Sequence, residues 1–182
     1  HRKASDDNWQ FKGDEEAKRK NIKQLTSIKP VKPHVKFHFR IRFENLSEVE
    51  LGAILFALEL PESCCHKLGM GKPLGLGSVK ITPTLFLIDR ESRYHRLFEG
   101  DGWRLATEQV ETRKFEEAFE KYILESTQNK EASFWDVERM KHLKTMLDWN
   151  NTTLRKWHEE TEYMTIKPNN EFQNRPVLPR PI

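Results

Sequence analysis

Apolar and polar residues alternate strictly over residues 37–43. The odd positions are apolar and the even positions are basic or histidine: Phe37, Phe39, Ile41 and Phe43 against His38, Arg40 and Arg42. Because successive side chains of a strand point to opposite faces, a period of two predicts a half-buried strand. We expect its aromatic face to point into the protein and its basic face to point outward.

A nearly continuous apolar run follows over residues 51–60. A helix that is apolar almost all round is typical of a position between layers of structure rather than on a surface. Ser47 and Glu50 have the spacing of a capping box, which predicts where this helix begins. Pro61 predicts where it ends. Gly52 would allow a neighbouring strand to approach the helix closely.

Glycine is concentrated in one segment, residues 66–81. Four of the eight glycines of the chain lie there within nine residues: Gly69, Gly71, Gly75 and Gly77. Apolar residues resume at Val79 and Ile81 and again over 85–88, which predicts a strand interrupted by Pro83. A strand, a helix, a glycine-rich loop and a second strand make up the closing half of a ferredoxin-like or RNA-recognition fold. The sequence therefore predicts an α+β fold.

The rest of the chain shows weaker patterns. A hairpin or surface loop with turns at Gly100 and Gly102 is expected over 89–101. The apolar spacing predicts three helical segments: 107–125, 133–149 with Ser133 as its cap, and a short turn over 152–158. The predicted organisation has four parts: a flexible basic arm or linker over 1–33, a β-α-loop-β unit over 34–105, a helical extension over 106–166 and an extended, proline-rich tail over 167–182.

Composition argues against several classes of protein. Of the 182 residues, 36% are apolar and 32% are charged, and the mean hydropathy is -0.79. No run approaches the roughly 18 apolar residues of a membrane helix, and no basic-then-apolar signal peptide opens the sequence. Only two cysteines occur, adjacent at Cys64 and Cys65, so neither a disulfide framework nor a complete zinc site is expected. We expect a soluble cytoplasmic protein without membrane contact, and the polar opening at His1 leads us to expect a piece of a longer chain.

The net charge of +3 is small, but its distribution is uneven. Residues 1–36 contain ten Lys or Arg against five Asp or Glu, a balance of +5. Residues 101–163 contain ten Lys or Arg against fourteen Asp or Glu, a balance of -4. The first segment could face phosphates, whereas the second is typical of a solvated helical surface.

The residues of the glycine-rich segment leave two interpretations open. Closely spaced glycines let backbone N–H groups approach an anion, and Lys67, Lys72 and Lys80 would add charge, so the loop could cradle phosphates. The spacing fits neither of the common glycine motifs for nucleotides. The alternative is a tight loop in which geometry alone requires glycine. Arg40 and Arg42 likewise either meet RNA or simply face solvent.

No arrangement of residues indicates catalysis. Asp89 follows an apolar strand and Asp101 lies between glycines, but neither has a recognisable base or metal partner. The motifs of serine hydrolases and of zinc proteases are absent, and the histidines lack the spacing of metal ligands. We therefore expect this segment to be non-catalytic and to hold no cofactor.

Residues 66–81 resemble the C-terminal glycine-rich loop of the RAMP superfamily of CRISPR proteins; their sequence is HKLGMGKPLGLGSVKI. Together with residues 37–60 and the tail over 174–179, they resemble the last Cas-seven-like module of type III effectors, and most of all that of the fused single-chain type III-E effector, the giant RAMP. The resemblance covers about residues 35–88 and the tail. It implies a ferredoxin-like, RNA-recognition-type fold that binds the backbone of crRNA in an antiviral endoribonuclease complex, which cleaves complementary target RNA.

Carried over residue by residue, the resemblance implies an RNA-binding set in and beside the loop: His66, Lys67, Gly69, Met70, Gly71, Lys72, Leu74, Gly75, Gly77, Ser78 and Lys80, with Arg40 and Arg42 before it. The cleaving aspartates of the family lie in other modules, and neither they nor its zinc-knuckle cysteines have a counterpart here. Any divalent metal and structural zinc would thus belong elsewhere in the effector. The implied partners are crRNA, target RNA, the other RAMP modules and a caspase-like TPR-CHAT peptidase.

A different class of function remains open at this point. The chain could be a structural assembly module of a CRISPR ribonucleoprotein, in which the glycine-rich loop packs on a neighbouring protein domain. A third possibility is a freestanding nuclease that processes CRISPR RNA, and this would require a catalytic histidine or tyrosine.

Overall fold

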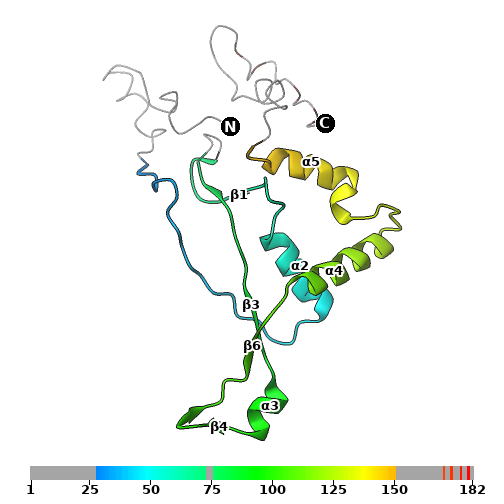
Figure 1. Cartoon of the computed structure of the whole chain (residues 1–182). Helices are drawn as coiled ribbons and strands as arrows, with labels where there is room; N and C mark the ends of the chain where they lie inside the picture. The colour runs from blue at the N-terminus through cyan, green and yellow to red at the C-terminus, as the bar shows by residue number, and fades with distance from the viewer. Residues whose placement is uncertain are drawn as a thin grey trace. The chain divides into compact units, whose positions relative to one another are not determined.

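The described part of the chain has an α+β fold. The structure is a computed structural model and describes residues 28–72 and 76–150, with the single residues 170, 173, 177 and 180. Within these residues lie four α-helices, a 3-10 helix and three two-stranded antiparallel sheets (Figure 1). The predicted α+β class is confirmed. Most of the predicted arm, the helical turn predicted over 152–158 and most of the predicted tail lie outside the described residues.

Contacts separate the chain into two units. Of the described residues, 28–42, 66–72 and 76–79 belong to the first unit, and 43–65 and 80–150 belong to the second. The first unit contains the glycine-rich segment. The second contains the helices and the apolar core.

Helix α2 (Glu48–Leu58) begins where its sequence predicts. The Ser47 N–H donates to Glu50 Oε2 over 2.8 Å, and the Glu50 N–H donates to Ser47 Oγ over 3.2 Å, so the capping box is confirmed. At the other end, Glu59 caps the helix, and its N–H donates to the carbonyl of Leu55 over 2.8 Å. Glu59 is two residues before Pro61, where the sequence predicts the end of the helix.

Strands β3 (Leu85–Ile88) and β6 (Thr107–Val110) form an antiparallel pair in the second unit. Leu85 lies opposite Val110, and Ile88 lies opposite Thr107. The prediction of a helix from residue 107 is wrong at its start, because residues 107–110 form this strand. Pairing with β3, which lies far away in the sequence, outweighs the helical spacing of the local apolar residues.

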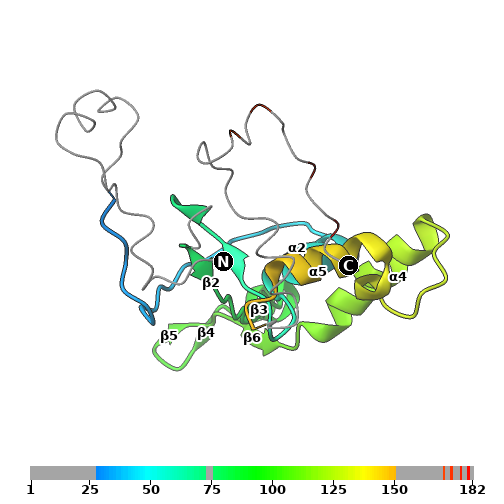
Figure 2. The same ribbon diagram turned by 90° about the horizontal axis from the view of Figure 1, so that it is seen from above.

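The remaining long helices are α4 (Arg113–Ser126) and α5 (Glu138–Leu147), joined through the 3-10 helix η3 (Phe134–Asp136). Ser133 caps η3, since its Oγ accepts the Trp135 N–H over 3.3 Å. The predicted cap is confirmed, although it opens a 3-10 turn and the α-helix follows it. Helices α2, α4 and α5 lie together on one side of this unit (Figure 2).

Two apolar clusters pack against different sides of α2. The first joins it to β3 and α4 through Leu51, Leu55, Leu85 and Phe115. The second joins it to η3 and α5 through Phe56, Phe134 and Met140. Burial on both sides confirms that α2 lies between layers, as its nearly uniform apolar composition predicts.

Gly52 allows a close approach, but to a helix rather than to the strand expected from the sequence. A Cβ at this position would lie 1.9 Å from the carbonyl oxygen of Phe115 in α4. The backbones of α2 and α4 can therefore cross closely only because residue 52 has no side chain.

Between β3 and β6, the chain forms helix α3 (Arg90–His95) and a hairpin of β4 (Phe98–Glu99) and β5 (Gly102–Trp103). The predicted turn is confirmed at Gly100, which has φ of +60°, whereas Gly102 is not a turn residue but the first residue of β5. Helix α3 replaces part of the loop predicted over 89–101. Its cap is Asp89, whose Oδ1 accepts the Ser92 N–H over 3.0 Å. In both views the hairpin extends away from α2, α4 and α5 (Figures 1 and 2).

In the first unit, β1 (His66–Lys67) pairs antiparallel with β2 (Ser78–Val79). The strand predicted over 37–43 is wrong for this structure: these residues form no strand, and the predicted β-α-loop-β unit lacks its first strand. The side chains of Phe37 and Phe39 are 73% and 65% exposed. An alternating pattern fixes which side chains share a face, but a strand forms only where a neighbouring segment pairs with its backbone, and the described residues supply none.

Candidate nucleic-acid interface

The glycine-rich segment forms a hairpin whose two arms are β1 and β2. His66 lies opposite Val79 and Lys67 opposite Ser78. Beyond the strands, the Leu68 N–H donates to the carbonyl of Gly77 over 2.8 Å, which extends the ladder toward the tip. Within the described tip residues, the Leu76 N–H donates to the carbonyl of Gly71 over 3.2 Å.

Three described glycines of this hairpin have the left-handed backbone conformation that favours glycine. The φ angles of Gly69, Gly71 and Gly77 are +81°, +72° and +73°. A Cβ on Gly77 would lie 1.9 Å from the Leu68 carbonyl oxygen, so geometry alone requires glycine there. A Cβ on Gly69 would have no heavy atom within 4 Å. Gly69 therefore combines an unusual backbone conformation with open space, which a ligand can enter.

The three lysines of the predicted set have different surroundings. Lys67 Nζ donates to Ser78 Oγ over 2.6 Å, which holds its ammonium beside the ladder. The side chain of Lys72 is exposed near the tip. Lys80 lies in the second unit, where its Nζ donates to the carbonyls that follow α2, those of Leu60, Pro61 and Glu62, over 3.0–3.3 Å. The structure brings Lys67 and Lys72 to the hairpin and engages Lys80 with backbone carbonyls.

The other residues of the predicted set are only partly described. Met70 is 70% exposed, and Leu68, an apolar residue two positions before it, is 67% exposed. His66 and Ser78 are half-buried in the strands. Leu74 and Gly75 lie outside the described residues.

Arg40 and Arg42 are exposed on the extended segment of the first unit. Within the described part of the chain, neither makes an ion pair or a side-chain hydrogen bond. The structure does not bring them into a sheet, because residues 37–43 have no ladder partner there. Their guanidinium groups remain available to a partner.

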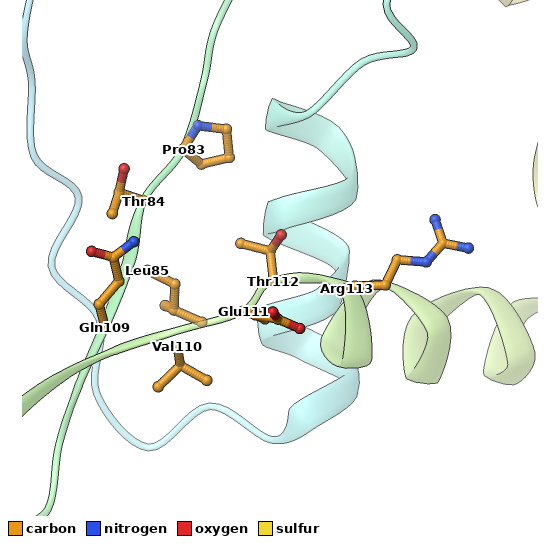
Figure 3. A pocket seen from close by; sticks show the side chains of 8 residues that line it. All are labelled: Pro83, Thr84, Leu85, Gln109, Val110, Glu111, Thr112 and Arg113. Atoms are coloured by element: carbon orange, nitrogen blue, oxygen red, sulfur yellow. The ribbon is translucent and has the colours of Figure 1, made fainter.

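A shallow pocket of about 320 Å³ lies in the second unit, where β3 and β6 meet the start of α4 (Figure 3). Eight residues line it: Pro83, Thr84, Leu85, Gln109, Val110, Glu111, Thr112 and Arg113. Arg113 Nε donates to Glu117 Oε1 over 2.7 Å, and its side chain points away from the other labelled side chains. The pocket contains none of the residues predicted to bind RNA.

Among the residues described, no three His, Cys, Asp or Glu side chains are arranged to hold a metal ion. Both cysteines are free thiols, and Cys64 is fully buried. Burial raises the pKa of the Cys64 thiol. None of the helices in residues 28–72 and 76–150 has the length and apolar character needed to cross a lipid bilayer.

Comparison with known proteins gives no assignment: no family model matches the chain, and the searches of curated proteins and of solved structures find no match.

A second exposed surface lies outside the set of residues that the resemblance implies. The β4–β5 hairpin carries the exposed rings of Phe98 and Trp103, with arginines on both sides of them in the sequence. Aromatic residues interleaved with arginine are a signal that could have identified this surface.

Proposed function

We propose that this chain is the crRNA-binding C-terminal segment of a type III CRISPR effector, an RNA-guided complex that targets RNA. In this proposal the chain is part of a ferredoxin-like RAMP module, and the β1–β2 hairpin contacts the backbone of the guide. The observation that carries the proposal is Gly69, whose positive φ and open surroundings let a backbone N–H meet an incoming phosphate. The proposed segment is itself non-catalytic and acts in the cytoplasm.

The electrostatics of the hairpin support the same role. Lys67 and Lys72 flank the open glycine in the sequence, and an ammonium is a strongly hydrated point charge suited to phosphate. Lysine contacts to phosphates release counterions, so affinity should fall steeply with salt. Arg40 and Arg42 would add two further cations to the same RNA. Sequence specificity would come from base pairing by the guide, by analogy with other RNA-guided effectors.

Within the proposed effector, cleavage of target RNA belongs to neighbouring RAMP modules. The parent effector would supply any divalent metal and structural zinc. In this proposal a caspase-like TPR-CHAT peptidase is a further partner of the effector.

The test is a salt titration of binding to a fluorescein-labelled single-stranded RNA of mixed sequence. In a Lys67→Ala/Lys72→Ala variant we expect weaker binding and a log–log salt slope shallower by about 1.4, because each lost phosphate contact on a single strand removes about 0.7. Lys121→Ala/Lys141→Ala is the matched control, since it removes the same charge from exposed positions on α4 and α5. Equal slopes in both variants would contradict the proposal.

A second variant separates the charge of Lys67 from its structural contact. Ser78→Ala removes the hydroxyl that accepts from Lys67 Nζ but keeps the ammonium. We expect its salt slope to stay that of the unsubstituted chain. A slope as shallow as that of the double lysine variant would instead mean that the lysine acts by stabilising the hairpin.

One observation favours the alternative function as an assembly module. The exposed side chains of Leu68 and Met70 give the hairpin an apolar surface that a neighbouring protein domain could cover. Photo-crosslinking from position 70 in the assembled complex distinguishes the two functions. RNA adducts support guide binding, whereas adducts to protein alone support the assembly module.

A further inference from the structure

The β4–β5 hairpin presents an exposed pair of aromatic rings. Phe98 and Trp103 lie opposite each other in the ladder, with ring centroids 4.8 Å apart and planes inclined by 36°. Their side chains are nevertheless 56% and 68% exposed. The two rings contact each other, and neither belongs to the apolar clusters of the unit.

The register shows which residues share the face of these rings. The Arg104 N–H donates to the carbonyl of Leu97 over 2.9 Å, so the pairing continues by one residue beyond Phe98 and Trp103. The backbone of Arg96 is extended as well, and continuing the period-two alternation of the strands by one more residue places Arg96 and Leu105 on the side of the aromatic pair. Leu105 is 63% exposed, and Arg96 is also exposed. The face therefore combines two aromatic rings, one guanidinium and one aliphatic side chain.

All the permanent cations of this region are arginines. Residues 89–105 contain four arginines and no lysine, against four Asp or Glu, so the formal balance is zero. Arg90 pairs with Glu44, whereas Arg93, Arg96 and Arg104 make no ion pair within the described residues. A planar guanidinium can stack on a base or hold a phosphate with two hydrogen bonds. A balance of zero, however, gives little long-range attraction to a polyanion.

We propose that this face of the β4–β5 hairpin binds unpaired bases of single-stranded RNA, with Trp103 and Phe98 as the stacking platform and Arg96 beside it. This inference deepens the proposed function and rests on it, because both assume that the chain binds the same RNA. The glycine-rich hairpin holds the phosphate backbone, whereas this hairpin holds bases. Exposed aromatic rings and a guanidinium are the groups on which the bases of a single strand stack, which favours RNA as the occupant of this face.

The test compares two RNA probes of equal length: single-stranded oligoadenylate and the corresponding abasic ribose-phosphate strand. The unsubstituted chain should bind oligoadenylate more tightly, because stacking on an aromatic side chain contributes about 1–3 kcal/mol per base. In Phe98→Ala/Trp103→Ala we expect the affinity for oligoadenylate to fall at least about fivefold while the affinity for the abasic strand stays the same. The salt slope should not change, because no cation is removed.

Two control variants keep the result interpretable. Tyr122→Ala removes a comparably exposed aromatic ring from α4 and should leave both affinities unchanged. Phe98→Tyr/Trp103→Phe keeps both ring planes and should retain the preference for bases, which separates stacking from any effect on the folding of the hairpin.

The outcomes also separate this inference from the proposed function. Equal binding of the two probes by the unsubstituted chain, or a preference for bases that survives Phe98→Ala/Trp103→Ala, overturns the inference and leaves protein contact as the use of this face. Lys67→Ala/Lys72→Ala should weaken binding of both probes and lower the slope. The lysine variant could instead bind both probes with the affinity and slope of the unsubstituted chain while Phe98→Ala/Trp103→Ala loses the preference for bases. That result would exclude the glycine-rich hairpin as the phosphate site and would support base binding by the β4–β5 hairpin.

Discussion

Gly69 and Gly77 both have a positive φ but differ in what surrounds them. At Gly77, alanine would add a steric clash with the Leu68 carbonyl to the strain of the left-handed conformation. At Gly69, alanine would add only that strain, about 1–2 kcal/mol. We expect Gly77→Ala to disrupt the hairpin and Gly69→Ala to leave it paired. Hydrogen exchange of the Leu68 amide, which donates to Gly77, reports the difference. Equal protection in the two variants would contradict this account.

The carboxyl of Glu116 on α4 is partly buried. Its Oε1 is buried without a hydrogen-bond partner among the described residues. Burial raises the pKa of this carboxyl, and the nearby Glu59 carboxylate raises it further. Glu59 in turn accepts the Thr112 hydroxyl over 3.3 Å. Ionisation of Glu116 therefore opposes folding.

Stability should consequently depend on pH with a defined sign. Since the pKa of Glu116 is higher in the folded chain, the destabilisation is absent below its unfolded pKa of about 4.3 and complete above the folded pKa. Glu116→Gln should raise the Tm at neutral pH and give the Tm of the unsubstituted chain near pH 4 and below. Thermal unfolding measured across this range checks it, with the exposed Glu125→Gln as control. A Tm raised equally at every pH would show that ionisation is not the cause.

At the scale of elements, Gly52 separates intrinsic helix propensity from packing. Propensity alone predicts that Gly52→Ala stabilises α2 by about 1 kcal/mol. We expect Gly52→Ala to lower the free energy of unfolding by about 1–3 kcal/mol, because the new Cβ would overlap the Phe115 carbonyl oxygen and push α4 away. Chemical denaturation measures the change. Ala57→Gly, at an exposed position of α2, is the control and should cost about 1 kcal/mol by propensity. A stabilised Gly52→Ala variant would rule out the close crossing.

The elements that the sequence predicts correctly are those with local signals. Ser47 and Glu50 are three residues apart and satisfy each other's backbone donors, so the start of α2 is encoded within one turn. Ser133 and Gly100 are local signals of the same kind. Residues 107–110 and 37–43 are the opposite case. The first forms a strand because β3 lies beside it, and the second forms none because the described chain places no segment beside it.

Some features of the candidate site could likewise be predicted from local sequence, and others depend on distant contacts. The glycine-rich composition predicts a tight, exposed turn, and the positive φ angles of Gly69, Gly71 and Gly77 agree with it. Nothing in the sequence distinguishes Lys80 from Lys67 and Lys72, yet Lys80 follows β2 into the other unit and binds the carbonyls after α2. The aromatic face of the β4–β5 hairpin depends on the register that sets Phe98 opposite Trp103, which residue types alone do not define.

At the scale of the whole molecule, the exposed apolar side chains over 37–43 predict how strongly the isolated chain binds hydrophobic dyes. Exposed aromatic side chains bind hydrophobic dyes, so Phe37→Ser/Phe39→Ser should lower dye fluorescence. Because these two rings are mostly exposed, the stability should change by no more than about 0.5 kcal/mol. Phe115→Ala, in the first apolar cluster, should instead lose about 3–5 kcal/mol and raise dye binding. A large loss of stability in the serine variant would show that these rings are buried.

By itself, the sequence determined the properties that depend on near neighbours: the α+β class, the capped apolar helix and the turn of the glycine-rich segment. Backbone conformation and helix caps involve residues a few positions apart, so composition and spacing are enough for them. Only the tertiary structure decided which strands have partners, which helix meets Gly52 and which lysines reach the hairpin. Those outcomes depend on contacts between distant segments, whose free energies no local pattern records.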